Sequence, residues 1–173
     1  MATSFHDLSV RCYLQTLTGV EGYLTKGLAY CEEHGIDPAG IVETRLYPDM
    51  FPFSFQLWSV AHHSLGAIRG IEEGVFTPPP PIPTLDYAGW QKLVSDSRET
   101  LAAMTPDAVN ALEGKDLLFK FGDFKLPFVA EDFVLSFSLP NLHFHATTAY
   151  DILRTKGVPL GKRDYTGPMR IKR

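Results

Sequence analysis

The chain alternates long stretches of helical hydrophobic periodicity with short segments rich in proline and glycine. From Phe5 to His34, apolar residues recur at intervals of three and four, a spacing that places them on one face of an α-helix. This face consists of Leu17, Val20, Leu24, Leu28 and Cys31. Gly35 follows at a position where glycine commonly ends a helix. The pattern therefore predicts a first long helix over residues 5–34.

The same periodicity predicts three further long helices. The second is expected at Phe53–Glu73, the third at Asp86–Met104, and the last from Ala130 or Glu131 to Lys156. Pro140 lies inside the last of these helices. Since proline has no backbone N–H to donate, we expect a kink there.

The connections between the helices complete the predicted fold. The run TPPPPIPT, residues 77–84, is expected to be a stiff extended segment that crosses one end of the helices. Alternation of apolar and polar residues around Gly122-Asp123 is typical of a small β-hairpin. Four amphipathic helices pack most simply as an all-α four-helix bundle, with this hairpin before the last helix. At 173 residues, the chain is expected to form one domain, 1–173.

Composition and charge argue against several classes of partner. The formal net charge of -4 argues against nucleic acid, which favours a basic face. No apolar run is long enough to cross a membrane, and the first residues lack the pattern of a signal peptide. Cys12 and Cys31 would lie roughly 28 Å apart on the first helix, too far for a disulfide. We therefore expect a reduced, cytoplasmic protein, with the basic segment 162–173 solvated.

Two histidines are expected to face each other across neighbouring helices. His62 and His63 are adjacent and therefore point about 100° apart, so only one of them can face a given site. Small residues share the face of His63, which favours it as the interior histidine. On the last helix, His143 points roughly 200° away from His145. We therefore expect His63 and His145 to converge on one site.

Imidazoles at such a site would suit acid–base catalysis, because histidine titrates near neutral pH. This makes His63 and His145 the candidate catalytic residues. Aromatic, hydroxyl and amide side chains nearby could line an apolar ligand pocket. The candidate ligand-binding residues are Trp58, Phe55, Asn141, Phe144, Thr148 and Tyr150. In the alternative interpretation, the aromatic residues belong to the core and the two histidines only satisfy neighbouring polar groups.

Three motifs carry a resemblance to a known superfamily: RLYPDMFPF at 45–53, LPNLHFHATTAYDILR at 139–154 and GVPLGKRDY at 157–165. Together with the helix order, they resemble an uncharacterised branch of the DinB/YfiT-like superfamily. The resemblance covers nearly the whole chain. It implies a DinB-like up-down-down-up four-helix bundle that forms a homodimer.

The resemblance also implies a metal site. Better-known members of the superfamily hold a divalent metal, zinc or nickel, with one histidine from the second helix and two from an HxxxH motif on the fourth. His63 matches the first of these ligands and His145 the last, whereas Asn141 stands in place of the remaining histidine. Asparagine is a poor ligand for these metals.

Three functions therefore remain open. The first is an enzyme that acts on an apolar small molecule between the second and fourth helices, with His63 and His145 as acid–base groups. The second is a non-catalytic dimeric module for ligand binding or assembly. The third, which the resemblance implies, is a divalent-metal-dependent thiol transferase or isomerase.

Overall fold

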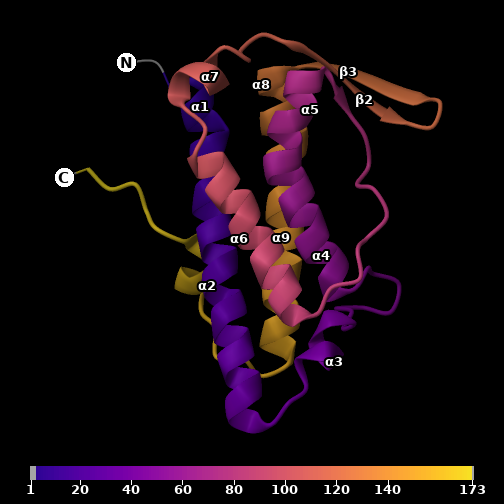
Figure 1. Ribbon diagram of the computed structural model, residues 1–173, viewed down its shortest axis with the longest axis vertical. Helices are drawn as coiled ribbons and strands as arrows, with labels where there is room; N and C mark the ends of the chain where they lie inside the picture. The colour runs from indigo at the N-terminus through magenta and orange to yellow at the C-terminus, as the bar shows by residue number, and fades with distance from the viewer. Residues whose placement is uncertain (1–2, 173) are drawn as a thin grey trace.

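The computed structural model describes residues 3–172. In that range, four long helical segments lie side by side, with a small sheet at one end (Figure 1). Their bounds are α2 (Val10–His34), α4–η1–α5 (Phe53–Ala61, His62–Gly66, Ala67–Glu73), α6 (Tyr87–Ala102) and α8–η2–α9 (Ala130–Phe133, Val134–Ser138, Leu139–Thr155). Helix α2 packs mainly on α6, and α4 mainly on α9. Contacts between α4 and α6 and between α2 and α9 close the arrangement around an apolar core.

The periodicity predicted the extents of these segments well, but the first helix is divided. A short helix α1 (Phe5–Leu8) precedes α2, and Ser9 between them has φ -106° and ψ -85°, outside helical values. The Ser9 hydroxyl donates to the carbonyl of Phe5 at 2.6 Å. Three more short helices, α3 (Pro38–Val42), α7 (Pro106–Asn110) and α10 (Lys162–Thr166), lie in the connections.

Two π-helical turns interrupt the second and fourth segments, where the sequence predicted continuous helix. These are η1 (His62–Gly66) and η2 (Val134–Ser138). The kink expected at Pro140 stays a prediction, and η2 ends two residues before this proline. A proline ring in a regular helix clashes with the carbonyl four residues earlier, and a wider turn just before it gives that carbonyl room.

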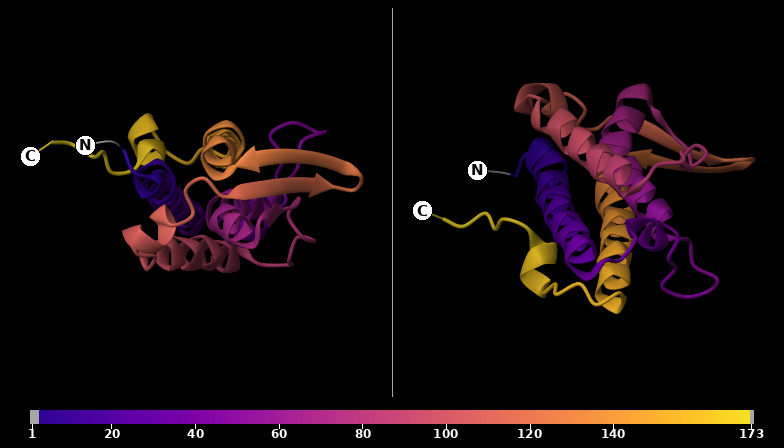
Figure 2. Two further views of the ribbon diagram at one scale, coloured as in Figure 1. Left: turned by 90° about the horizontal axis from the view of Figure 1, so that it is seen from above. Right: turned by 60° about the horizontal axis from the view of Figure 1, so that its bottom comes forward.

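The fold is mostly helical and not all-α, because a three-stranded sheet covers one end of the helices. The predicted hairpin is confirmed as antiparallel β2 (Asp116–Phe121) and β3 (Phe124–Val129), which extend away from the helices (Figure 2). A third strand, β1 (Val75–Phe76), pairs in parallel with β2 and was not predicted. Two residues are too few to produce a recognisable alternation of apolar and polar positions.

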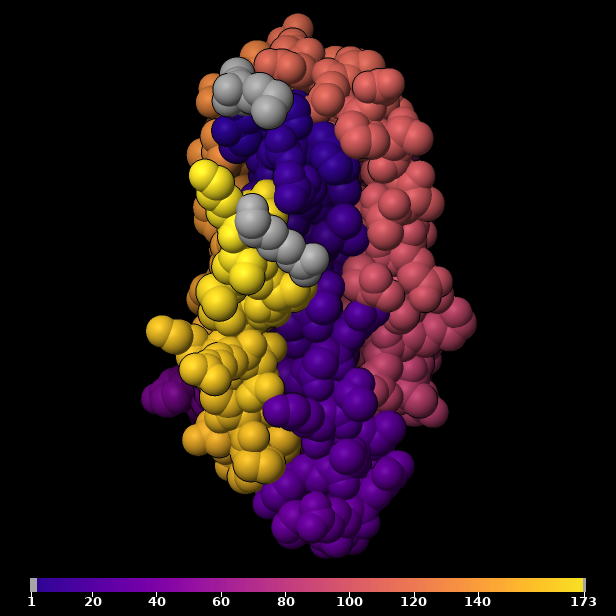
Figure 3. Space-filling view, turned by 90° about the vertical axis from the view of Figure 1, so that its left-hand side faces the viewer, coloured from indigo at the N-terminus to yellow at the C-terminus, as the bar shows by residue number. Residues whose placement is uncertain are grey.

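We expected the basic C-terminal segment to be a solvated tail, but part of it packs on the rest of the protein. Helix α10 packs on α2, and the following residues continue along the same face (Figure 3). The approach is close at Gly19, where an added Cβ would lie only 2.3 Å from the carbonyl oxygen of Tyr165. The side-chain amide of Gln15 donates to the carbonyl of Thr166, and Lys26 forms a 2.6 Å ion pair with Asp164. The tail prediction for Arg173 lies outside the described residues.

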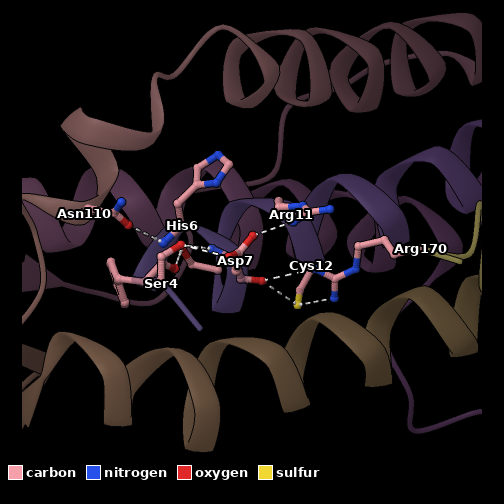
Figure 4. Close-up of polar contacts among 9 residues, drawn as sticks. Ser4, His6, Asp7, Arg11, Cys12, Asn110 and Arg170 are labelled. Carbon is pink, nitrogen blue, oxygen red and sulfur yellow. Dashed lines mark hydrogen bonds and ion pairs between the residues drawn. The ribbon is translucent and has the colours of Figure 1, made fainter. Parts of the chain in front are cut away.

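Polar contacts also fasten the N-terminal turn to its surroundings (Figure 4). The hydroxyl of Ser4 accepts from the backbone N–H of Asp7, and the carboxylate of Asp7 pairs with Arg11 at 2.6 Å. Arg170, from the C-terminal segment, contacts the thiol of Cys12 at 3.6 Å. Cys12 and Cys31 are both free, as their predicted separation on one helix required. Among residues 3–172, no helix has the length and apolar character needed to span a membrane.

Candidate functional site

The π-helical turn η1 directs its two histidines to different neighbours. The ring of His62 stacks on Phe76 at 4.4 Å, and its Nε2 donates to the carbonyl of Thr77 at 2.8 Å. His63 turns toward the interior and is only 7% exposed. The choice of His63 as the interior histidine, which rested on the small residues that share its face, is therefore confirmed.

His63 and His145 face each other across the contact between the second and fourth segments. Their ring centres lie 5.8 Å apart and their planes differ by 13°. The rings of Phe76 and Phe137 also lie beside His63, with their centres 5.6 Å and 5.8 Å from the centre of its ring. The predicted convergence of the two imidazoles is thus present in the structure.

A buried glutamine determines which ring nitrogen of His145 carries the proton. Gln56 is 2% exposed, and its side-chain N–H₂ donates to the carbonyl of Phe51 at 2.9 Å. Its Oε1 is therefore the atom 2.8 Å from Nδ1 of His145. Because an amide oxygen only accepts, Nδ1 of His145 carries the proton and donates. The other ring nitrogen, Nε2, is left as an acceptor. The sequence analysis did not identify Gln56 as a residue of this site.

Both imidazoles of the pair are held neutral at pH 7. Burial, with smaller contributions from the neighbouring rings of His62 and His145, lowers the pKa of His63 to about 3. Burial, and to a lesser extent His62, lowers the pKa of His145 to about 4. The Nδ1 atom of His63 is buried and has no hydrogen-bond partner among the described residues. Such an unsatisfied buried group is uncommon in folded proteins and calls for an explanation, such as a catalytic role or a bound water or ion.

The two π-helical turns meet behind His63 in a buried hydrogen-bond chain. The hydroxyl of Ser138, at the end of η2, donates to the backbone carbonyl of His63 at 2.7 Å. Since that serine has a single proton, the 2.7 Å contact between its oxygen and Tyr13 is donated by the tyrosine. Burial raises the pKa of Tyr13, so it remains a donor. This chain ties α2, η2 and η1 together and fixes the backbone that carries His63.

Replacement of Ser138 by alanine should destabilise the protein by about 1–3 kcal/mol, because it leaves the buried groups of Tyr13 and His63 without a partner. Urea unfolding followed by far-UV circular dichroism would measure this loss. Ser136→Ala, which removes an exposed hydroxyl from the same π-helical turn, is the matched control and should change stability by less than about 0.5 kcal/mol. Equal losses in the two variants would contradict the role of the buried chain.

The predicted ligand-binding residues do not gather in one place. Phe55 lies beside the histidine pair, with its ring centre 6.0 Å from that of His145. Phe144 contacts His145 edge-on at 5.3 Å, but it is 57% exposed and lines a shallow surface pocket of about 490 Å³ together with Thr148. Trp58 lines a different pocket, between α4 and α6.

The remaining predicted residues have structural partners elsewhere. Tyr150 packs edge-on against Tyr23 and Tyr165, on the side of α9 that faces α2 and α10. His143, which was not expected to join the pair, lies 3.2 Å from the hydroxyl of Tyr165. The structure therefore brings together His63, His145, Phe55 and Phe144 from the predicted set, and adds Gln56.

The residues around the pair do not fit a three-histidine metal centre. Asn141 stands one helical turn before His145, and its side-chain N–H₂ donates to the carbonyl of Phe137 at 2.7 Å. This leaves two imidazoles, whereas zinc sites of this type take three protein ligands and an open position. Within residues 3–172, no three His, Cys, Asp or Glu side chains form a cluster that could hold a metal ion.

Comparisons with known proteins agree with the resemblance found in the sequence. A solved structure described as a DinB family member protein from Shewanella denitrificans superposes with a TM-score of 0.77 at 23% identity, covering 97% of this chain and 94% of that one. No curated protein matches the chain. The model of the family described as "Domain of unknown function (DUF1993)" matches residues 5–166. This match spans nearly the whole sequence, and the chain therefore belongs to the DUF1993 family and has a DinB-like fold.

Proposed function

We propose that the protein binds an apolar small molecule between α4 and α9 and uses His63 and His145 as proton-accepting and hydrogen-bonding groups. The observation that carries this proposal is the buried Nδ1 of His63, which has no partner among the described residues. Leaving a buried polar group unsatisfied costs stability. A bound molecule with its own donor or acceptor would supply the missing hydrogen bond.

The protonation of the pair supports this role. Nε2 of His145 is free to accept, since Gln56 holds the proton on Nδ1. Both pKa values lie well below 7, so neither ring carries a charge that would oppose an apolar ligand. Aromatic rings flank both histidines, with Phe137 beside His63 and Phe55 beside His145. Such a mixture of apolar walls and few polar groups is typical of small-molecule sites.

A thermal-shift screen with apolar small molecules that carry one hydrogen-bonding group would test the proposal. Wild type should be compared with His63→Phe, His145→Phe and the control His143→Phe, which replaces the histidine that lies away from the pair. Compounds that stabilise the wild type and the control should fail to stabilise the other two variants. Compounds that stabilise all four proteins equally would contradict the proposal.

The second candidate function, a non-catalytic dimeric module, draws support from exposed apolar side chains next to the histidine pair. Tyr47 is 66% exposed and Phe51 is 60% exposed, and Leu46 and Met50, each next to one of them in sequence, line the surface pocket that also contains Phe144. Large apolar patches on a surface often mark sites of association. Light scattering of wild type and Phe51→Ser would test this: a dimer that dissociates in the variant supports it, and a monomer in both cases excludes it.

We also propose that the four helical segments follow the up-down-down-up order implied by the resemblance. The colour gradient in Figure 1 supports it, because α2 and α9 run in one direction while α4 and α6 run in the other. The extended proline segment between α5 and α6 has the length to return the chain to the opposite end. No observation among residues 3–172 favours the thiol-dependent activity.

A further inference from the structure

A pocket lies between the second and third helical segments, on the side of α4 away from the histidine pair. Its volume is about 390 Å³, within the range of small-molecule sites. Neither His63 nor His145 lines it. The boundary between the two regions is η1, where the rings of His62 and His63 meet edge-on at 5.3 Å and point into different spaces.

Apolar faces of two helical segments line this pocket, and a proline covers it. Trp58, Ala61 and Leu65 form one wall, and Leu93 on α6 forms the other. The covering residue is Pro80 from the extended segment. The indole N–H of Trp58 donates to the carbonyl of Pro80 at 2.9 Å and holds it in place. An apolar ligand body would therefore be enclosed on three sides.

A single unpaired cation lies at one end of the pocket. The exposed side chain of Arg69 lines it and forms no ion pair or hydrogen bond with any group in residues 3–172. The carboxylate that also lines the pocket, Asp96, is already bound by Lys92 at 2.7 and 2.9 Å. The guanidinium group is planar and matches a carboxylate through two parallel hydrogen bonds.

The hydroxyl groups in the pocket wall have no proton left to donate to a ligand. Ser97 donates to the carbonyl of Leu93 at 2.8 Å, and Thr100 donates to the carbonyl of Asp96 at 2.7 Å. Arg69 is therefore the strong donor that this pocket offers to an anion. It lies seven residues beyond His62, or roughly 10 Å along the helix axis, so the anionic group and the apolar body would occupy different ends.

Gly66 lines the pocket in a position where its backbone does not need glycine. Its φ of -60° and ψ of -33° are helical, and glycine within a helix is less favourable than alanine. An added Cβ would lie 3.2 Å from Nδ1 of His62, which has no proton because Nε2 donates to Thr77. The missing side chain thus keeps space open beside His62, about one helical turn before Arg69.

We propose that this pocket binds a carboxylate with an unbranched apolar body, with the carboxylate on Arg69 and the apolar chain between Trp58 and Leu93. This site is separate from the histidine pair and does not depend on the function proposed for it. The apolar walls, the one unpaired guanidinium and the space at Gly66 together define the ligand class.

Octanoate and octanamide are suitable probes, because they differ only in the charge of the head group and do not absorb where tryptophan emits. Binding can be followed through the fluorescence of Trp58. The other tryptophan, Trp90, is buried in the core, so Trp58→Phe should remove the fluorescence change on binding. Octanoate should bind about tenfold or more tightly than octanamide. Arg69→Gln should abolish this preference, whereas Arg163→Gln, on α10 outside the pocket, should preserve it.

Gly66→Ala provides the second test, because it narrows the pocket without removing charge. We expect the variant to keep its far-UV circular dichroism spectrum and lose octanoate affinity by about tenfold or more. Equal binding of the acid and the amide, an unchanged preference in Arg69→Gln, or full affinity in Gly66→Ala would each overturn the proposal. Absence of any response to octanoate at Trp58 would overturn it as well.

Discussion

The free energy of unfolding should fall steeply as the pH decreases from about 6.5 toward 4, and His63 and His145 should account for much of this fall. In the unfolded chain both histidines have a pKa near 6.5, whereas in the folded protein the pKa values are about 3 and about 4. Between these limits the unfolded state binds more protons than the folded state. Stability is therefore fully present above pH 6.5 and is lost as the pH falls.

The size of the effect follows from linkage. Each histidine contributes up to about 1.4 kcal/mol per pH unit in this window. Over two pH units the pair would remove about 5 kcal/mol, which is comparable to the total stability of many domains. Burial also lowers the pKa of His62 and of His143, which adds to the loss in the same direction. The carboxyl group of Asp164, whose pKa is lowered by the N–H of Gly161 and by Lys26, contributes only at still lower pH.

Urea unfolding at a series of pH values from 8 to 4.5 would measure this dependence, with His63→Phe as the test variant. Phenylalanine suits the position because Phe76 and Phe137 already pack around it. The difference in stability between the two proteins should be constant above pH 7.5 and should shift in favour of the variant below pH 6.5. Parallel curves over the whole range would show that His63 is not held neutral by burial.

The helical framework could be predicted because its signal extends over many residues. Each long helix repeats its apolar face over at least four turns, so a local irregularity does not change the assignment. The π-helical turns η1 and η2 add only a fraction of a turn each, which the hydrophobic pattern does not reveal. The strand β1 comprises two residues and depends on pairing with β2, a contact more than forty positions away in the sequence.

The centre of the site was predicted from helix geometry, whereas its lining was assigned from aromatic character without that geometry. Regular helical rotation places Gln56, seven residues before His63, within about 20° of the same face. That spacing could have identified the glutamine as a partner of the pair. Trp58, five residues before His63, points about 140° away, and this explains why it lines the pocket toward α6. Aromatic character alone therefore grouped residues that helix geometry separates.

The substitution Asn141→His should complete a three-histidine divalent-metal site with His63 and His145. A histidine at 141 would stand one turn before His145, and side chains at this spacing lie next to each other on a helix. With zinc–nitrogen distances of about 2.0–2.1 Å, two rings on one ion have centres roughly 5–6 Å apart. The observed separation of 5.8 Å between His63 and His145 matches this requirement.

The expected result is one equivalent of bound Zn²⁺ or Ni²⁺ after dialysis, measured by elemental analysis, and a metal-dependent rise in melting temperature. At a metal concentration 100 times the dissociation constant, the stabilisation would be about 2.7 kcal/mol. Gly22→His is the control, because it adds an exposed imidazole to α2 with no His, Cys, Asp or Glu three or four residues away. The double variant Asn141→His with His145→Phe should lose the site.

One substitution should be enough to give metal binding, because the hydrogen bond that supports His145 as a ligand is already present. Histidine ligands usually donate their second ring N–H to an oxygen, which fixes the ring and strengthens the ligand. Gln56 already makes this contact with Nδ1 of His145 and leaves Nε2 free. Metal binding by Asn141→His but not by Gly22→His would therefore mean that the wild type differs from a three-histidine centre by one side chain. Identical behaviour of the two variants would mean that His63 and His145 cannot direct their free nitrogens to a common point.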